Sequence, residues 1–265
     1  MLVIKKIISP VLIISLMSCT SLVKENYATP IQLVGDSGGY LILDAKAGEG
    51  YVINTRKGEK EVFGLPYVTS EELIVIAGRD ILMQPVDYGE SRITITNNSL
   101  VNLSPEDQAR ANTEAIKVNQ AVKQVTEQTD FNFDFFPPVQ NYITSGYGKK
   151  RFINGNPRSP HLALDIDGYE GDPIYAPKAG VVVIAEEHFY SGKMMLINHG
   201  GGLFTSYSHM SDWVAEEGDY VEAKELIGKV GSSGRVTGPH LHWVVYLNGN
   251  RINPELLVDL QYYQD

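Results

Sequence analysis

Three places in the chain combine histidine with spacings that suit metal binding or proton transfer. His240 and His242 lie two residues apart in a β-branched and aromatic run that continues to Leu247, which is typical of a strand. Side chains of a strand alternate in direction, so both imidazoles are expected on one face. Such a pair suits a metal site or a proton-transfer site. The alternative is a pair of core histidines with satisfied hydrogen bonds.

A second pattern occupies residues 160–167, where His161, Ala163 and Asp165 alternate with apolar residues. A proline before and a glycine after this stretch favour a short strand, on which the imidazole and the carboxylate reach a common point. With one histidine of the later pair they would supply two nitrogens and one oxygen. That ligand set suits zinc and leaves a coordination position open for water.

The third pattern is Tyr207 and His209, which are expected to point the same way from an extended segment. The chain holds six histidines, and four of them lie in these three patterns. The other two are expected outside the site. His188 is predicted to be a surface loop residue, and His199, beside three glycines, is predicted to have a structural role.

With these three patterns the chain resembles a known family, the lysostaphin/LytM zinc metallopeptidases, which cut cell-wall peptides. The resemblance covers residues 138–258 and rests on three motifs in the family's order: His161-x-x-x-Asp165, Tyr207-x-His209 and His240-x-His242. The segments at 145–148, 154–160 and 234–239 are similar as well.

The resemblance implies a role for each of these residues. His161, Asp165 and His242 would bind zinc, and His209 and His240 would be the catalytic histidines. Zinc would lower the pKa of a bound water to about 7 and polarise the scissile carbonyl. Which catalytic histidine accepts the proton and which stabilises the oxyanion stays open.

Tyr207 and Arg235 are two further candidates, expected to hold the substrate or the transition state. The reaction implied is hydrolysis of peptidoglycan cross-links, with the D-Ala–diaminopimelate bond as the expected target. One alternative is a catalytically silent relative that activates cell-wall amidases, although all five principal positions hold the required residue types. Another is a hybrid-motif binding module, which would not need clustered metal ligands.

The expected fold class is mainly β. Residues 171–183 and 218–230 form a near-repeat that resembles the duplicated hybrid motif of the family. We therefore expect an antiparallel β catalytic domain of this type over 138–258.

A small β-sandwich-like domain is predicted over 31–100, from short apolar runs at roughly ten-residue spacing. These runs are Tyr40–Leu43, Tyr51–Ile53, Glu61–Phe63, Leu73–Ile76, Ile81–Gln84 and Arg92–Thr96. One connecting helix is predicted over 104–128, because Ser104 can cap it and Pro105 suits the first helical position.

The first residues are predicted to direct export. In residues 1–18 two lysines precede an apolar stretch too short to span a bilayer, and Ser18 precedes Cys19, the only cysteine. This resembles a lipoprotein signal peptide, with lipidation at Cys19 and a polar tether over 19–30. The alternative is an ordinary secretory signal with a chance cysteine. In the Gram-negative lipoproteins that this segment resembles, a residue other than aspartate after the cysteine, here Thr20, implies the periplasmic face of the outer membrane.

The charge of the chain excludes some partners. Its formal net charge is −10, and it becomes −12 without residues 1–18. That argues against nucleic acid and against an anionic membrane face as partners, so the lipid alone would hold the protein at the membrane. The protein is expected to be a monomer whose partner is peptidoglycan.

Overall fold

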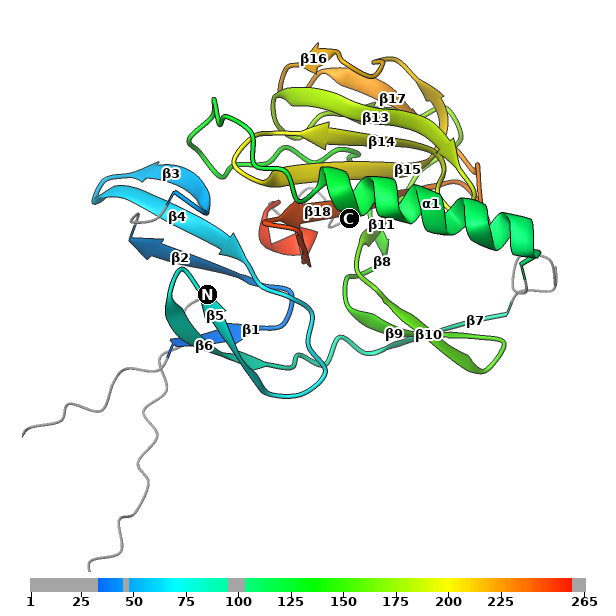
Figure 1. Cartoon of the computed structure of the whole chain (residues 1–265). Helices are drawn as coiled ribbons and strands as arrows, with labels where there is room; N and C mark the ends of the chain where they lie inside the picture. Colours follow the sequence, from blue (N-terminus) through cyan, green and yellow to red (C-terminus); the bar gives the residue numbers. More distant parts are fainter. Residues whose placement is uncertain (1–32, 45–47, 95–102, 259–265) are drawn as a thin grey trace, which may run out of the picture.

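The protein is built mainly from β-strands, as the sequence predicted, with one long helix among the residues described (Figure 1). The computed structural model describes residues 33–44, 48–94 and 103–258. The predicted signal peptide, the tether and Cys19 lie outside these residues. Within the described part, no helix is both long and apolar enough to cross a bilayer.

The N-terminal part contains two small sheets, in agreement with the sandwich-like arrangement predicted there. One sheet has the order β1 (Leu33–Asp36), β6 (Arg79–Gln84) and β5 (Glu72–Ile76). The other has the order β2 (Tyr40–Asp44), β4 (Gly58–Gly64) and β3 (Tyr51–Thr55). A small core of Leu41, Leu65, Val68, Ile81 and Met83 lies between them. Apolar residues alternate along β2 and β6 because one face of each sheet is buried.

A ten-stranded sheet forms the C-terminal part, and its described pairs are all antiparallel. Its main path is β16 (Tyr220–Val221), β13 (Gly180–His188), β14 (Gly192–Asn198), β15 (Leu203–Trp213), β18 (His240–Leu247), β11 (Leu164–Asp167) and β8 (Ile143–Ser145). Beside it lie β12 (Pro173–Tyr175), β17 (Leu226–Val230) and β19 (Asn250–Ile252), followed by a short 3-10 helix at Pro254–Leu256. Strands β14 and β18 are mainly apolar and buried because apolar layers cover both of their faces.

Helix α1 (Pro105–Ala121) covers one face of this sheet (Figure 1). The backbone N–H of Asp107 donates to Oγ of the N-cap residue, Ser104, at 3.0 Å, as the sequence predicted. The helix ends at Ala121, earlier than the predicted end at 128. Val118 and Val122 pack on the sheet beside Met194, so apolar contact holds the C-terminal end of the helix on the sheet.

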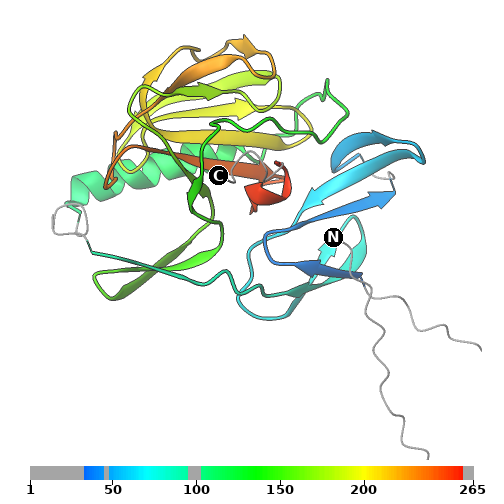
Figure 2. The ribbon, with the colours of Figure 1, turned by 180° about the vertical axis from the view of Figure 1, so that it is seen from behind.

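A third sheet joins the two parts of the chain, in the order β10 (Asn156–His161), β9 (Lys149–Ile153) and β7 (Glu90–Ile93). Strands β9 and β10 form an antiparallel hairpin, and β7 pairs in parallel with β9. Figure 2 shows β7 running from the N-terminal sheets to this hairpin. The division of the chain into domains stays a prediction, and this sheet draws strands from both sides of it.

The N-terminal sheets also pack directly on the C-terminal one. Tyr51 and Val62 are fully buried in the main core cluster of the C-terminal sheet. A Cβ at Gly64 would lie 2.4 Å from the carbonyl oxygen of Leu247, so only glycine permits the approach of β4 to the end of β18. The two parts therefore share one core.

Candidate metal centre

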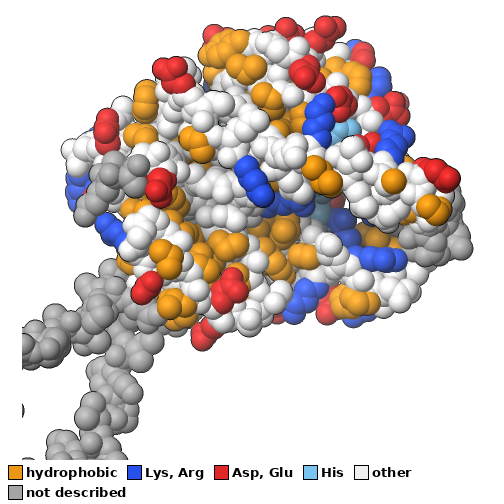
Figure 3. Space-filling model, in the orientation of Figure 1, with side chains coloured by type: hydrophobic (Ala, Val, Ile, Leu, Met, Phe, Trp, Pro, Cys, Tyr) orange, Lys and Arg blue, Asp and Glu red, His pale blue; other side chains and the backbone are white. Residues whose placement is uncertain are grey.

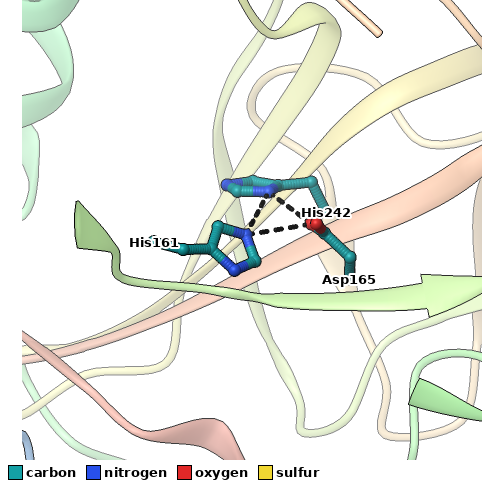
Figure 4. Close-up of side chains that lie close together, drawn as sticks. All are labelled: His161, Asp165 and His242. Carbon is teal, nitrogen blue, oxygen red and sulfur yellow. Dashed lines mark hydrogen bonds and ion pairs between the residues drawn. The ribbon is translucent and has the colours of Figure 1, made fainter. Parts of the chain in front are cut away.

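Three predicted site residues meet on the large sheet and its neighbouring hairpin (Figure 4). Asp165 on β11 lies directly opposite His242 on β18, and His161 is the last residue of β10. Oδ1 of Asp165 lies 2.8 Å from Nδ1 of His242 and 3.1 Å from Nε2 of His161. The two imidazole nitrogens are 3.4 Å apart. Side chains separated by up to 81 residues thus present three ligand atoms to one point.

These three atoms fit a zinc ion. Bonds of 2.0–2.1 Å in a tetrahedral site place ligand atoms about 3.3 Å apart, close to the observed separations. The other ring nitrogen of His161, Nδ1, lies 3.1 Å from the carbonyl oxygen of Gly146 and 3.3 Å from Oγ of Ser145. A proton on Nδ1, donated to that carbonyl, leaves the lone pair of Nε2 directed at the shared point. Two nitrogens and one carboxylate oxygen leave room for a fourth ligand.

The electrostatics of the triad favour the protonation states that bind a metal. Burial alone would raise the pKa of Asp165, but hydrogen bonds with His161 and His242 outweigh it and hold that pKa far below its usual value. Burial lowers the pKa of His242, more than the neighbouring Asp165 raises it. An ionised carboxylate and a neutral imidazole are the metal-binding forms.

His209 and His240 lie beside the triad. Their ring centroids are 4.9 Å apart, and Nε2 of His240 is 3.8 Å from Oδ1 of Asp165. In each ring Nδ1 lies 2.9 Å from a backbone carbonyl oxygen, that of Ser233 for His209 and that of Gly238 for His240. A proton on Nδ1 then leaves Nε2 of each ring as an acceptor.

Burial lowers the pKa of His209 to about 3, and the nearby His242 and His240 contribute. This imidazole is therefore neutral near pH 7 and able to accept a proton. Its backbone is unusual as well, with φ of 66°. A non-glycine residue in the left-handed region is strained and is held there by its surroundings.

Tyr207 is not brought to the site, unlike His209. Its side chain is fully buried in the core, and its hydroxyl lies 2.7 Å from Oγ1 of Thr205. Register shifts along β15 and the positive φ of His209 break the strict alternation on which the prediction rested. Ser206 and Ser208 face the cavity beside the site instead.

Two smaller expectations are also corrected. Residues 160–167 do not form one strand, because β10 ends at His161 and β11 begins at Leu164, with a bend between them. This bend brings the end of the hairpin over the sheet.

His188 was predicted at the surface, but it is 6% exposed at the end of β13 and lines the site cavity. His199 is buried with both ring nitrogens bonded, as expected of a structural residue.

Two cavities adjoin the triad. One of about 530 Å³ contacts His161 and His242 and runs along α1, and one of about 420 Å³ contacts Asp165, His209, His240 and His242. Arg235, a predicted support residue, lines both.

Arg151 lines both cavities and Arg158 lines the larger one, and the sequence reasoning missed both. The sequence signal that could have located them is Asn154-Gly155, a dipeptide typical of hairpin turns, in which both residues have positive φ. A turn there places Arg151 opposite Arg158.

Comparison with known proteins agrees with this geometry. Residues 159–254 match the model of peptidase family M23. The peptidoglycan DD-endopeptidase ShyA of Vibrio cholerae is 36% identical over 112 residues, which are 42% of this chain and 26% of the relative. The DD-carboxypeptidase/endopeptidase Mpg of Neisseria meningitidis is 34% identical over 132 residues, 50% of this chain and 30% of the relative. The chain thus spans less than a third of the length of these two relatives.

A solved structure extends the similarity to most of the chain. The crystal structure of a peptidase M23 from Pseudomonas aeruginosa superposes with a TM-score of 0.64 and 26% identity. It covers 83% of this chain and 93% of that one, so the arrangement of the N-terminal sheets beside the C-terminal one has a counterpart there. Together with the family match over residues 159–254 and a triad that could hold a metal ion, this supports the similarity of the C-terminal part of the chain to peptidase family M23.

Proposed function

We propose that this protein is a zinc-dependent endopeptidase that hydrolyses peptide cross-links of peptidoglycan, with the D-Ala–diaminopimelate bond as its substrate. The observation that carries the proposal is the convergence of five residues. His161, Asp165 and His242 present ligand atoms to one point, and His209 and His240 lie beside them. The names of the curated relatives supply the substrate class.

In this proposal His161, Asp165 and His242 hold zinc, which would supply a Lewis acid for activating water and polarising a carbonyl. The ionised state of Asp165 and the neutral state of His242 suit them to that role. The carbonyl of Gly146 holds His161 in the required tautomer.

His209 and His240 carry the proton transfers. Because their Nδ1 atoms face backbone carbonyls, both rings offer Nε2 to the substrate. The low pKa of His209 keeps it neutral, so it can accept a proton from the attacking water. Nε2 of His240 lies 3.8 Å from the Asp165 carboxylate, and in the imidazolium form this nitrogen would donate a hydrogen bond to the oxyanion or a proton to the leaving amine.

The location proposed is the cell envelope, with the protein attached through lipid at Cys19 to the periplasmic face of the outer membrane. Peptidoglycan is the partner, and the protein acts as a monomer. The support for this is the sequence pattern of residues 1–19 and the substrate class.

The test is digestion of purified, diaminopimelate-containing peptidoglycan by the zinc-loaded protein, followed by separation and mass spectrometry of the muropeptides. Cross-linked dimers should fall, monomers should rise, and a chelator should stop both changes. The His242→Ala variant is the matched negative control. Unchanged dimers with fully zinc-loaded protein would contradict the proposal.

A further inference from the structure

Arginines gather at the cavities beside the metal centre. Arg151 and Arg235 line both cavities and Arg158 lines the larger one, whereas each cavity has a single acidic lining residue, Glu114 or Asp165. Figure 3 shows Lys and Arg side chains around the hollow below α1, where a histidine is visible. In a chain with a formal net charge of −10, this positive charge at the site opposes the overall balance and favours an anionic ligand.

Two of these arginines are placed directly opposite each other. Arg151 on β9 pairs with Arg158 on β10, so both side chains leave the same face of the hairpin. Like charges at a cross-strand pair destabilise a sheet. Burial lowers the pKa of Arg235, and the positive charges of Arg151 and Arg158 lower it further. Arg235 is therefore close enough to Arg151 and Arg158 to be repelled by both, and an anion between the three guanidinium groups would relieve that repulsion.

The guanidinium of Arg151 has an unused donor. Its Nε is buried, and no acceptor within the described residues lies within hydrogen-bond distance. A buried donor is normally paired, and an unpaired one at a cavity points to a ligand that pairs it. The guanidinium fork matches a carboxylate, whose two oxygens accept two parallel hydrogen bonds.

Arg235 is held in position by the loop after β13. Its guanidinium carbon lies 4.1 Å from the centroid of the Tyr190 ring, and its backbone N–H donates to the carbonyl oxygen of Tyr190 at 3.0 Å. Stacking of this kind fixes the plane of a guanidinium before a ligand arrives. Tyr190 itself lines both cavities.

From these contacts we propose that Arg151, Arg158 and Arg235 bind a free carboxylate of the substrate, the one on the carbon that carries the scissile amide nitrogen. The inference rests on the proposed function. Because Arg151 and Arg235 share the smaller cavity with Asp165 and His240, the carboxylate that they bind lies close to the bond that is cut.

The chemistry of the cross-link supplies such a group. In diaminopimelate each amine-bearing carbon also bears a carboxylate, so the amide formed with D-Ala has a negative charge one carbon from its nitrogen. A glycine bridge has an uncharged amide at that position. A terminal D-Ala–D-Ala bond has a carboxylate there, and we expect it to be cleaved as well.

The experiment compares two synthetic cross-linked stem peptides that differ only at this carboxylate, which is free in one and amidated in the other. The full-length, zinc-loaded protein should cleave the acid with a kcat/KM at least ~10-fold above that for the amide. Arg151→Met should lower kcat/KM for the acid by at least ~10-fold and leave that for the amide nearly unchanged. Arg158→Met, at an exposed position, tests the same point without altering a buried residue.

Arg56→Met, in an exposed turn far along the chain from either cavity, is the matched control and should keep the full preference for the acid. Equal cleavage of acid and amide by the unmodified protein would overturn the inference and leave the proposed function standing. So would an equal loss on both substrates in Arg151→Met and Arg158→Met. Cleavage of neither peptide by zinc-loaded protein would overturn the proposed function, and the inference with it.

Discussion

Asp165 and His242 face each other across strands β11 and β18, with Oδ1 and Nδ1 2.8 Å apart. Because they are directly opposite residues of an antiparallel pair, the backbone hydrogen bonds fix the relative position of two of the three candidate ligands before any metal binds. A slip of one residue would turn Asp165 to the opposite face. The geometry of the candidate metal centre therefore depends on strand register, and the apolar neighbours Leu164 and Ile166, both fully buried, hold that register.

Replacing His161 with Ala should remove the metal. The change leaves one nitrogen and one oxygen at the site, and we expect zinc affinity to fall by at least ~100-fold, with a lower melting temperature in the presence of zinc. Zinc content after dialysis and thermal unfolding measure this. His188→Ala, a buried histidine of the same cavity outside the triad, is the control and should keep its zinc. Full occupancy in His161→Ala would exclude this residue as a ligand.

Replacing His209 or His240 with Ala should separate catalysis from metal binding. Both variants should retain stoichiometric zinc, because neither ring belongs to the group of converging ligand atoms. Hydrolysis of cross-linked peptide should fall by ~10²-fold or more. The check is zinc content and turnover on the same preparation. Normal turnover would remove the residue from the mechanism, and loss of zinc from the His240 variant would instead make it a ligand.

His199 should make the fold sensitive to acid. Burial lowers its pKa to about 4, whereas the unfolded chain has the ordinary value of about 6.5. Between these values the unfolded chain binds more protons, so the stability that neutral His199 contributes is present above pH 6.5 and is lost as the pH falls towards 4. The loss between pH 7 and pH 4.5 should be roughly 2–3 kcal/mol.

Denaturant unfolding at the two pH values tests this. In His199→Gln, which cannot titrate, the drop between pH 7 and pH 4.5 should be smaller by about that amount. Carboxylates contribute equally to both proteins and cancel in the comparison. An identical drop in both proteins would show that His199 titrates normally in the folded state.

Lys178 should contribute to stability through the segment that follows α1. Its side chain is 2% exposed, and its ammonium donates to a carboxylate oxygen of Asp130 at 2.6 Å and to Oδ1 of Asn132 at 2.8 Å. Lys178→Met removes these bonds, and we expect a loss of about 2 kcal/mol, below the value for a fully buried pair because Asp130 is partly exposed. Lys117→Met removes the exposed pair with Glu186 and should change stability by less than ~1 kcal/mol. Equal effects in the two variants would contradict a structural role for Lys178.

Much of the fold followed from alternation and turn chemistry. The apolar runs predicted between Tyr40 and Gln84 overlap β2 to β6, because half-buried strands show a period of two. The run predicted at 92–96 shares its first two residues with β7, and residues 95 and 96 lie outside the described part of the chain. Strand β18 was detectable from its β-branched and aromatic composition. What the sequence did not reveal was pairing between distant segments, such as β7 with β9, since no local pattern encodes a parallel partner.

In the candidate site, too, some positions could be predicted from local sequence patterns and others could not. His240 and His242 share a face because β18 is regular, whereas Tyr207 and His209 do not because β15 is irregular. The contribution of Arg151 was invisible for a different reason. Its neighbours Lys149 and Lys150 make it part of a basic run that reads as a solvated surface, and only the hairpin turn directs it to the cavity.

The pairing of β7 with β9 has a consequence for exchange of parts between relatives. The family match begins at residue 159, after both Arg151 and Arg158, and the hairpin that carries them takes its third strand from residues 90–93. A graft bounded at 159–254 would therefore transfer the three candidate metal ligands and Arg235 without Arg151, Arg158 and the strand that supports their hairpin. An exchange that is meant to transfer the proposed carboxylate preference should therefore move the hairpin together with its supporting strand β7.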